Sequence, residues 1–369
     1  MPSKDNALIM YVGCYTNKKE AAISVFRCDP SLDKPELVQQ VTGIRNASFL
    51  AVDAEGGKLY AVSEVHETDG QPGGAVACYR IDPESGKLTE HGPRQLTHGN
   101  DPCYVIVNRH GAHGACLLVA NYSGGSVARF PLRNEDGGLE PASQIIAHKG
   151  ASLATDRQEA PHPHSIVLDP SGSYAVVPDL GRDKLVVYLN APEQGGLVPH
   201  GETETDAGAG PRHFVFHPDQ PRAYVINELN GTITAYDYDA GQGSLSPVQT
   251  VPVLPADFQG SNTCADLHLS PDGKFLYGSN RGHDSIAVFA VEPTYGRLTP
   301  IGHVPTRGRT PRNFGITPDG NFLVAANQES DNLVTFRIDR TNGMLEWTGQ
   351  EIAVSEPVCV AFMTTNSLK

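Results

Sequence analysis

Short alternating apolar runs, separated by turn residues, recur along the whole chain. A typical unit begins at Asn262 and reads NTCADLHLSPDGKFLYGSNRGHDSIAVFAVEPTYGRL, with three apolar runs and a turn at residues 270–273. Proline presets the backbone of such turns and glycine supplies a positive φ, so they join strands in hairpins. No segment has the apolar spacing of a long helix. The pattern therefore predicts an all-β protein.

The apolar pattern belongs to an internal repeat. The segment GPRHFVFHPDQPRAYVINELNGTITAYDYDAGQGSL from Gly210 aligns without a gap with TPRNFGITPDGNFLVAANQESDNLVTFRIDRTNGML from Thr310. Looser copies bring the total to six. Equivalent positions are Ala47, Pro102, Pro163, Pro211, Cys264, Pro311 and Pro357, spaced 46 to 61 residues apart. A period near 50 residues is typical of the blades of a β-propeller.

The two ends of the chain hold the fragments of one more blade. The segment EPVCVAFM from Glu356 supplies a single strand, whereas LIMYVGCY, AISVFRCDP and PELVQQ supply three strands near the N-terminus. An incomplete blade would leave an exposed sheet edge and an open ring. We therefore predict a single domain over residues 1–369, a seven-bladed β-propeller of four-stranded antiparallel blades. Its ring is closed by pairing the N-terminal strands with the C-terminal strand.

Composition narrows the partners and the compartment. The 369 residues alone would suggest two domains, but 38 glycines and 28 prolines suit many short strands better. The 28 Lys and Arg against 42 Asp and Glu give a net charge of −14, which argues against nucleic acid or an anionic membrane as partner. The N-terminal apolar run is too short for a signal peptide, and the seven scattered cysteines form no CxxC pair. We expect structural thiols and a cytoplasmic location.

Equivalent positions of a propeller converge around one axis, so residues about 50 apart in sequence are expected to meet. The residues after the aligned positions are Ser48, Cys103, His164, Arg212, Ala265, Arg312 and Val358, and the next are Phe49, Tyr104, Ser165, His213, Asp266, Asn313 and Cys359. The second apolar runs end at Ser63–Glu64, Asn121–Tyr122, Asp179–Leu180, Asn227–Glu228, Asn280–Arg281 and Asn327–Gln328. Polar residues concentrate in blades three to six, which predicts a site at one mouth of the central channel.

The candidate residues favour a small anionic ligand. Arg212, Arg281 and Arg312, together with His162 and His164, would form a positive pocket on an acidic protein. The alternative for each arginine is a salt bridge between blades. The alternative for each recurring asparagine is a side chain that stabilises a turn.

Several other chemistries are disfavoured. The chain has no GxSxG, no Walker loop and no GxGxxG between a strand and a helix, which argues against covalent and nucleotide-dependent mechanisms. His162 and His164, like Asp266 and His268, are two residues apart and could share a metal only if both lay on one face of a strand. A metal is the lesser alternative, and no cofactor is predicted.

At these residues the chain resembles a known family, the seven-bladed propeller lactonases. That family includes the bacterial propeller type of 6-phosphogluconolactonase and the fungal carboxy-muconate lactonising enzyme. The motifs are YVGCYT at Tyr11, VANYSGGSV at Val119, HPHSIVLDPSG at His162, GPRHFVFHP at Gly210, VINELNGT at Val225, ADLHLSPDG at Ala265, SNRGHDSIAVF at Ser279 and TPRNFGITPDG at Thr310. The resemblance implies that His164, Arg212, Glu228 and Arg281 carry the chemistry.

The implied reaction is the hydrolysis of a sugar-acid lactone, first of all 6-phospho-D-glucono-1,5-lactone. It needs a base for water, a donor for the oxyanion and a proton for the leaving alkoxide. Glu228 is the candidate base, Arg212 or Arg281 the oxyanion donor, and His164 the acid or an orienting donor. Substrate contacts are expected from Asn121, Tyr122, His162, His213, Asp266, His268, Arg312, Asn327 and Gln328. The alternatives are lactone-forming cyclisation of a carboxy-muconate, and a non-catalytic propeller that binds a protein partner.

Overall fold

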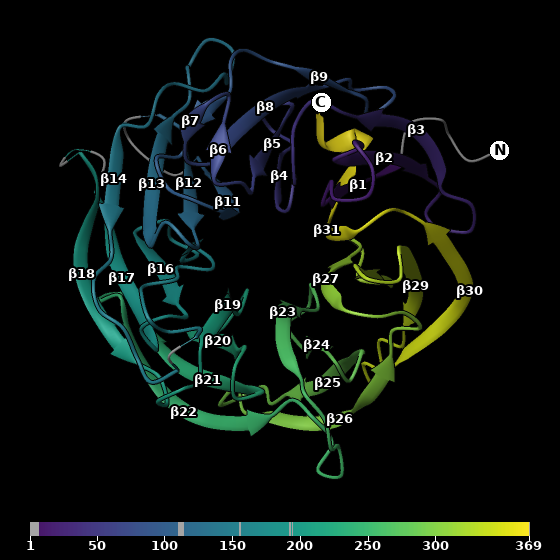
Figure 1. Ribbon diagram of the computed structural model, residues 1–369. Coiled ribbons are helices and arrows are strands. Elements are labelled where there is room, and N and C mark those ends of the chain that lie inside the picture. Colours follow the sequence, from purple (N-terminus) through teal and green to yellow (C-terminus); the bar gives the residue numbers. More distant parts are fainter. Residues whose placement is uncertain (1–6, 110–113, 155, 192, 194, 369) are drawn as a thin grey trace.

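Seven antiparallel sheets stand in a ring around a common axis (Figure 1). The computed structural model describes residues 7–109, 114–154, 156–191, 193 and 195–368. The element η2 (Thr365–Leu368) is a short 3₁₀ turn, and no described helix is long and apolar enough to span a bilayer. The predicted seven-bladed propeller is confirmed.

Each blade has an innermost strand beside the axis and further strands towards the rim. The innermost strands are β4 (Leu50–Asp53), β11 (Pro102–Asn108), β15 (Val167–Leu168), β19 (Pro211–Phe216), β23 (Thr263–Leu269), β27 (Pro311–Ile316) and β31 (Pro357–Thr364). The second strands are β5 (Lys58–Ser63), β12 (Cys116–Asn121), β16 (Tyr174–Asp179), β20 (Arg222–Asn227), β24 (Phe275–Arg281), β28 (Phe322–Asn327) and β1 (Leu8–Cys14).

The two outer positions follow the same order. The third strands are β8 (Ala75–Ile81), β13 (Ser126–Pro131), β17 (Lys184–Ala191), β21 (Thr232–Asp239), β25 (Ser285–Val291), β29 (Asn332–Ile338) and β2 (Ile23–Cys28). The rim strands are β9 (Leu88–Glu90) with β10 (Gln95–Leu96), β14 (Gln144–Ala147), β18 (Gly196–Glu204), β22 (Ser244–Pro252), β26 (Leu298–Pro305), β30 (Leu345–Ala353) and β3 (Glu36–Val41). A small hairpin, β6 (Glu67–Thr68) and β7 (Gln71–Pro72), extends from blade one.

The ring closes where the two ends of the chain meet. The order of the closing sheet is β3-β2-β1-β31, so three N-terminal strands and one C-terminal strand share a blade. In Figure 1 the purple strands lie beside the yellow β31. The antiparallel pairing runs from Leu8 opposite Thr364 to Gly13 opposite Cys359. This is the predicted closure.

The hydrophobic core is divided among the seams between blades. Seven clusters of buried apolar side chains each join two neighbouring sheets. The cluster between blades one and two, for example, packs Tyr60 and Val62 of β5 against Leu117 and Val119 of β12. Because both faces of a blade are covered, all six residues of β5 are buried. This explains why the second strands read as nearly continuous apolar runs.

Buried tyrosines add a recurrent hydrogen bond across the seams. Each hydroxyl donates to the carbonyl of a turn glycine in the next blade: Tyr11 to Gly86 at 2.9 Å, Tyr60 to Gly137 at 2.7 Å, Tyr224 to Gly296 at 2.8 Å and Tyr277 to Gly343 at 3.0 Å. A tyrosine at these positions buries its ring while its hydroxyl keeps a partner. The repeat therefore fixes neighbouring blades by polar as well as apolar contacts.

Two blades depart from the regular pattern because of proline. In blade one the rim strand is split into β9 and β10 around Gly92 and Pro93, so that sheet has five strands. Pro93 has no N–H for the ladder, and Gly92 has a φ of 80°. In blade three the innermost strand shrinks to two residues, with Pro163 held by a single bridge to Asp179. The polar side chains of blade three thus leave from irregular backbone.

Candidate active site

A repeated main-chain hydrogen bond defines equivalent side-chain positions on one face of the ring. In five blades, the residue that follows the second strand donates its N–H to the carbonyl of a residue that precedes the innermost strand of the same blade. The pairs are Glu64 with Asn46 at 3.0 Å, Tyr122 with Asp101 at 2.9 Å, Leu180 with His162 at 3.0 Å, Glu228 with Gly210 at 2.7 Å and Gln328 with Thr310 at 3.0 Å. Glu64, Tyr122, Leu180, Glu228 and Gln328 therefore occupy corresponding places around the axis.

Aspartates in the loops of this face fix the start of the next blade. Asp183 and Asp284 have φ values of 54° and 52°, and each accepts a main-chain hydrogen bond at 2.8 Å, from Gly210 and Thr310 respectively. Thr310 itself has a φ of 58°, which is strained for a β-branched residue. The backbone is thereby held two residues before each of the site arginines of blades four and six, Arg212 and Arg312.

Glu228 lies at the centre of a cluster of arginines. Its Oε1 atom is 2.5 Å from Nη2 of Arg157, and its Oε2 atom is 2.9 Å from Nε of Arg212 and 3.1 Å from Nη2 of Arg281. These groups come from blades four and five and from the connection between β14 and β15. The predicted meeting of Arg212, Glu228 and Arg281 is therefore seen in the structure, with a fourth residue, Arg157, that the sequence analysis did not nominate.

The charges of the cluster decide the ionisation of Glu228. Burial of its carboxyl would raise the pKa, but Arg281, Arg212 and Arg157 together lower it to about 2. The sequence left open whether burial or the arginines would have the larger effect on the pKa of Glu228. The arginines have the larger effect. Glu228 is thus a carboxylate at neutral pH.

This ionisation is expected to stabilise the folded state in a definite pH window. The folded-state pKa lies below the ordinary 4.5, so the stabilisation, roughly 3 kcal/mol, is complete above about pH 4.5 and is lost as the pH falls towards 2. The free energy of urea unfolding of Glu228→Gln should therefore approach that of the wild type as the pH falls from about 5 to about 3. A difference that stays constant over this range would contradict the assignment, and Glu329→Gln at an exposed position serves as the control.

The guanidinium of Arg212 has further partners besides Glu228. Its Nη1 atom donates to the carbonyl of Ala265 at 2.7 Å and lies 3.2 Å from Nε2 of His213. His213 therefore accepts at Nε2 and donates from Nδ1 to Asp266 at 2.7 Å. Burial and Arg212 lower the pKa of His213 to about 4, so the ring is neutral and this tautomer is held. His213 orients the guanidinium of Arg212.

Asp266 accepts hydrogen bonds from side chains of several blades. Its carboxylate accepts from Nε2 of His268 at 2.8 Å and from Nδ2 of Asn313 at 2.5 Å, in addition to His213. Asn313 in turn accepts the N–H of Val360, in the C-terminal strand, at 2.7 Å. Asp266, His213 and His268 were predicted to contact substrate. In the structure Asp266 and His213 are buried and hydrogen-bonded to each other, whereas the side chain of His268 is 39% exposed.

His164 joins the cluster through aromatic contacts. Its ring centroid is 5.3 Å from that of Tyr122, whose hydroxyl is 3.3 Å from Nη2 of Arg157, and Tyr122 stacks on His162 at 4.5 Å. Burial and the positive charge of Arg212 lower the pKa of His164 well below its usual value, so its imidazole is uncharged. The four predicted catalytic residues therefore lie in one continuous cluster.

Cys103 lies beside His164, with its Sγ atom 3.7 Å from Nδ1 of the imidazole. Burial strongly raises the pKa of Cys103, so the group is a thiol and not a reactive thiolate. All seven cysteines are buried and free, which agrees with the expected structural thiols. Among the described residues no group of three or more His, Cys, Asp or Glu side chains has the arrangement of a metal site.

A second group of charges completes the positive face. Arg312 lies over the ring of Tyr15 at 5.4 Å and is 3.8 Å from Oε1 of Glu64, which also accepts from the Tyr15 hydroxyl at 2.9 Å. Four arginines thus face two carboxylates, which leaves an excess of positive charge for an anion. Glu64 and Tyr15 were visible at repeat positions and in YVGCYT but were not nominated as site residues.

The recurring asparagines serve the blades themselves. Asn121 donates to Ser126 Oγ at 3.0 Å and Asn327 donates to the carbonyl of Thr306 at 3.1 Å, and both side chains are fully buried. These positions correspond to the structural alternative stated above and leave neither amide at the surface of the cluster. Gln328 is partly buried at the place equivalent to Glu228.

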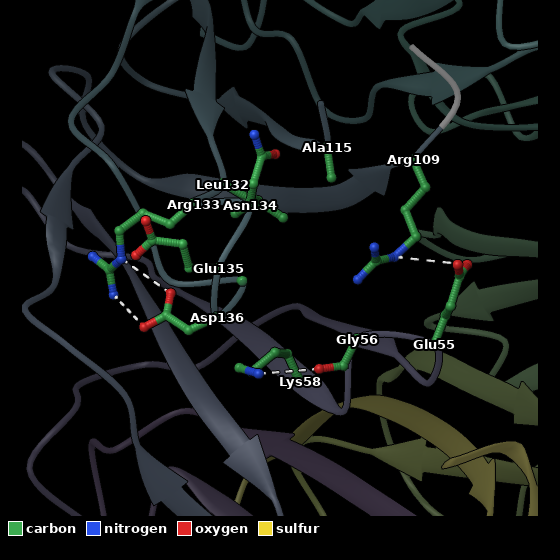
Figure 2. Close-up of a pocket in the computed structure, with 11 residues that line it drawn as sticks. Glu55, Gly56, Lys58, Arg109, Ala115, Leu132, Arg133, Asn134, Glu135 and Asp136 are labelled. Carbon is green, nitrogen blue, oxygen red and sulfur yellow. Dashed lines mark hydrogen bonds and ion pairs between the residues drawn. The ribbon is translucent and has the colours of Figure 1, made fainter. Parts of the chain in front are cut away.

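A cavity of about 400 Å³ lies on the opposite face of the ring, at the other ends of the strands of blades one and two (Figure 2). It is lined by charged groups that already have partners: Arg133 pairs with Asp136, Arg109 contacts Glu55, and the Lys58 ammonium donates to the carbonyl of Gly56 at 3.0 Å. None of the predicted site residues lines this cavity. The predicted catalytic residues therefore lie in the arginine cluster and not at this cavity.

The fold and the cluster define a class, a propeller with buried arginines and a carboxylate at one end of its axis. A family model described as lactonase, 7-bladed beta-propeller, matches residues 9–362. The chain belongs to this family, which confirms the resemblance found in its motifs.

Individual relatives cover nearly the whole chain. A 6-phosphogluconolactonase of Bacillus subtilis is 38% identical over 360 residues, 96% of this chain and 98% of the relative. One from Formosa agariphila is 36% identical over 83% of this chain and 86% of its own length. Among solved structures, the periplasmic gluconolactonase of Pseudomonas aeruginosa has a TM-score of 0.90 at 35% identity, covering 97% of this chain and 99% of that one. The cytoplasmic location expected here stays a prediction.

Proposed function

We propose that this protein hydrolyses 6-phospho-D-glucono-1,5-lactone to 6-phosphogluconate. The observation that carries the proposal is the buried Glu228 carboxylate, surrounded by Arg157, Arg212 and Arg281 within 2.5 to 3.1 Å. An excess of guanidinium groups suits a phosphorylated substrate, and guanidinium forms strong charge-assisted hydrogen bonds with phosphate. The names of the relatives from Bacillus subtilis and Formosa agariphila agree with this substrate.

In the proposed mechanism, Glu228 accepts a proton from water as the water oxygen bonds to the lactone carbonyl carbon. Arg212, or Arg281 beside it, donates to the oxyanion that develops on the carbonyl oxygen. The bond from the carbonyl carbon to the ring oxygen then breaks, and the proton returns to the leaving alkoxide. His164, uncharged, donates a hydrogen bond to that ring oxygen. One water is consumed, and the resulting carboxylic acid ionises in solution.

The raised pKa of Cys103 supports a mechanism without a covalent intermediate. The neutral imidazole of His164 is suited to donating and orienting, because its conjugate acid is scarcely populated at neutral pH. Arg212 is suited to the oxyanion, since His213 and Ala265 fix its guanidinium before substrate arrives. Each role thus falls to a group whose charge state the cluster determines.

The test is a direct comparison of substrates. Purified protein is supplied with freshly made 6-phospho-D-glucono-1,5-lactone, D-glucono-1,5-lactone and a carboxy-cis,cis-muconate, and acid release or diene absorbance is followed after subtracting the uncatalysed rate. We expect the highest kcat/KM on the phosphorylated lactone. Turnover of the muconate alone would favour lactone-forming chemistry, and no acceleration of either lactone would refute the proposal.

A further inference from the structure

Arg157 differs from the other arginines of the cluster in its origin. It lies in the connection between β14 and β15, outside the repeated strands that carry Arg212, Arg281 and Arg312. The side chain of Arg157 is 37% exposed, compared with 2% for Arg212 and 13% for Arg281. It is therefore the most accessible of the three cations that contact Glu228.

The backbone beside Arg157 is nevertheless firmly anchored. The neighbouring Gln158 is fully buried, and its Nε2 atom donates to Asp183 Oδ1 at 2.7 Å and to the carbonyl of Leu180 at 2.8 Å. Its Oε1 atom accepts the N–H of Ala154 at 3.1 Å. The same Asp183 oxygen accepts from Gly210, two residues before Arg212. The base of Arg157 is thus tied to the backbone that positions Arg212, while its guanidinium reaches over the cluster.

The present contacts of Arg157 can be exchanged without leaving an isolated buried charge. Its Nη2 atom contacts Glu228 Oε1 at 2.5 Å and the Tyr122 hydroxyl at 3.3 Å. If these contacts break, Glu228 Oε2 still has Arg212 and Arg281. Oε1 would then be free to accept a proton, and the guanidinium would be free to bind an anion.

We propose that Arg157 is an exchangeable anion clamp: its guanidinium breaks its contact with Glu228 and binds the phosphate of the substrate. This exchange frees the Glu228 carboxylate for the attacking water. This inference rests on the function proposed above and names the residue that selects phosphorylated over unphosphorylated lactones. The bonds made and broken are those of the hydrolysis already described. Phosphate binding would thus promote catalysis as well as affinity, because Glu228 is freed when the anion takes its place on Arg157.

The proposal has a pH signature in addition to a rate effect. The charged and titratable groups that act on Glu228 or border it are Arg157, Arg212, Arg281, Arg312, Tyr122 and Cys264. Removing the positive charge of Arg157 should raise the pKa of Glu228, while Arg212 and Arg281 keep it lowered. The acid limb of kcat/KM on an unphosphorylated lactone should therefore move to higher pH.

The experiment compares Arg157→Gln with the wild type on the phosphorylated and unphosphorylated lactones. The ratio of their kcat/KM values should fall on the order of 10²-fold in the variant. Activity on the unphosphorylated lactone should rise, because Glu228 is free without an anion, and its acid limb should move upward. The control is Arg182→Gln, which removes an arginine of blade three that pairs with Glu202 at 2.7 Å and leaves the cluster intact. This control should keep the wild-type ratio.

A binding measurement gives a readout besides activity. Inorganic phosphate should stimulate hydrolysis of the unphosphorylated lactone, because it draws Arg157 away from Glu228, and it should raise the Tm of the wild type. Both effects should weaken in Arg157→Gln. Arg157→Lys, which keeps the charge, should give an intermediate ratio and serves if the glutamine variant does not fold. An equal loss on both lactones, or an unchanged ratio, would overturn the clamp while leaving the lactonase assignment intact. A wild type inactive on both lactones would instead overturn the proposed function.

Discussion

Replacing Arg212 by alanine is expected to lower kcat/KM for lactone hydrolysis on the order of 10²-fold or more. The side chain is 2% exposed and its guanidinium is held by Ala265 and His213, so in the proposed mechanism its donors meet the developing oxyanion without reorganisation. Glu228 keeps Arg157 and Arg281 as partners and stays ionised. The loss should therefore fall mainly on kcat.

Steady-state kinetics with a folding check decides the matter. Circular dichroism and the Tm must show that Arg212→Ala retains its tertiary structure. Arg212→Lys keeps the charge but loses the planar fork of donors, and it should recover only part of the activity. A well-folded alanine variant with wild-type kcat/KM would remove Arg212 from the catalytic set.

Removal of residues 1–40 is expected to abolish cooperative folding. The truncation eliminates β1, β2 and all but the last residue of β3, so β31 loses its only neighbour in the closing sheet. It also exposes the apolar surfaces that pack against this blade from both sides, including the partners of Tyr11 and Val12. The lost burial exceeds the 5 to 15 kcal/mol by which a typical domain is stable. A soluble truncation with a sharp melting transition would contradict the closure.

A matched pair of substitutions tests the same blade without truncation. Val12 in β1 is fully buried, whereas Leu37 in β3 is 49% exposed. Val12→Asp should lower the free energy of unfolding by more than about 4 kcal/mol, because it buries an unpaired charge. Leu37→Asp should change it by no more than about 0.5 kcal/mol. Urea unfolding followed by fluorescence would measure both.

The ring and its closure were predictable because the repeat carries them. Each copy has its own turns and apolar runs, and the fragments at the two ends add up to a blade only if they pair. The same regularity placed Arg212, Glu228 and Arg281 near one axis, since equivalent positions share a height and radius. Arg312 also follows from this rule, but its partners Tyr15 and Glu64 had to be seen in the structure.

Features that the repeat does not encode could not be predicted from the sequence. Arg157 lies in an irregular connection, and its approach to Glu228 depends on the hydrogen bonds of Gln158 to Asp183 and Leu180. Asn121 and Asn327 were expected at substrate hydroxyls because asparagine recurs, yet in the four blades that carry it this asparagine makes hydrogen bonds within the protein. A repeated residue thus indicates architecture, and the chemistry is found where the repeats differ.

The main-chain bond that holds Glu64, Tyr122, Leu180, Glu228 and Gln328 has a consequence for how substrate preference can change over time. The N–H group makes this bond whatever side chain the residue carries, so the side chain at each of these five positions can change while the bond is kept. Leu180 is the apolar residue among them and lies between two polar ones. Because the Leu180 side chain is fully buried, a polar residue there needs a hydrogen-bond partner from its neighbours before it can contribute to substrate preference.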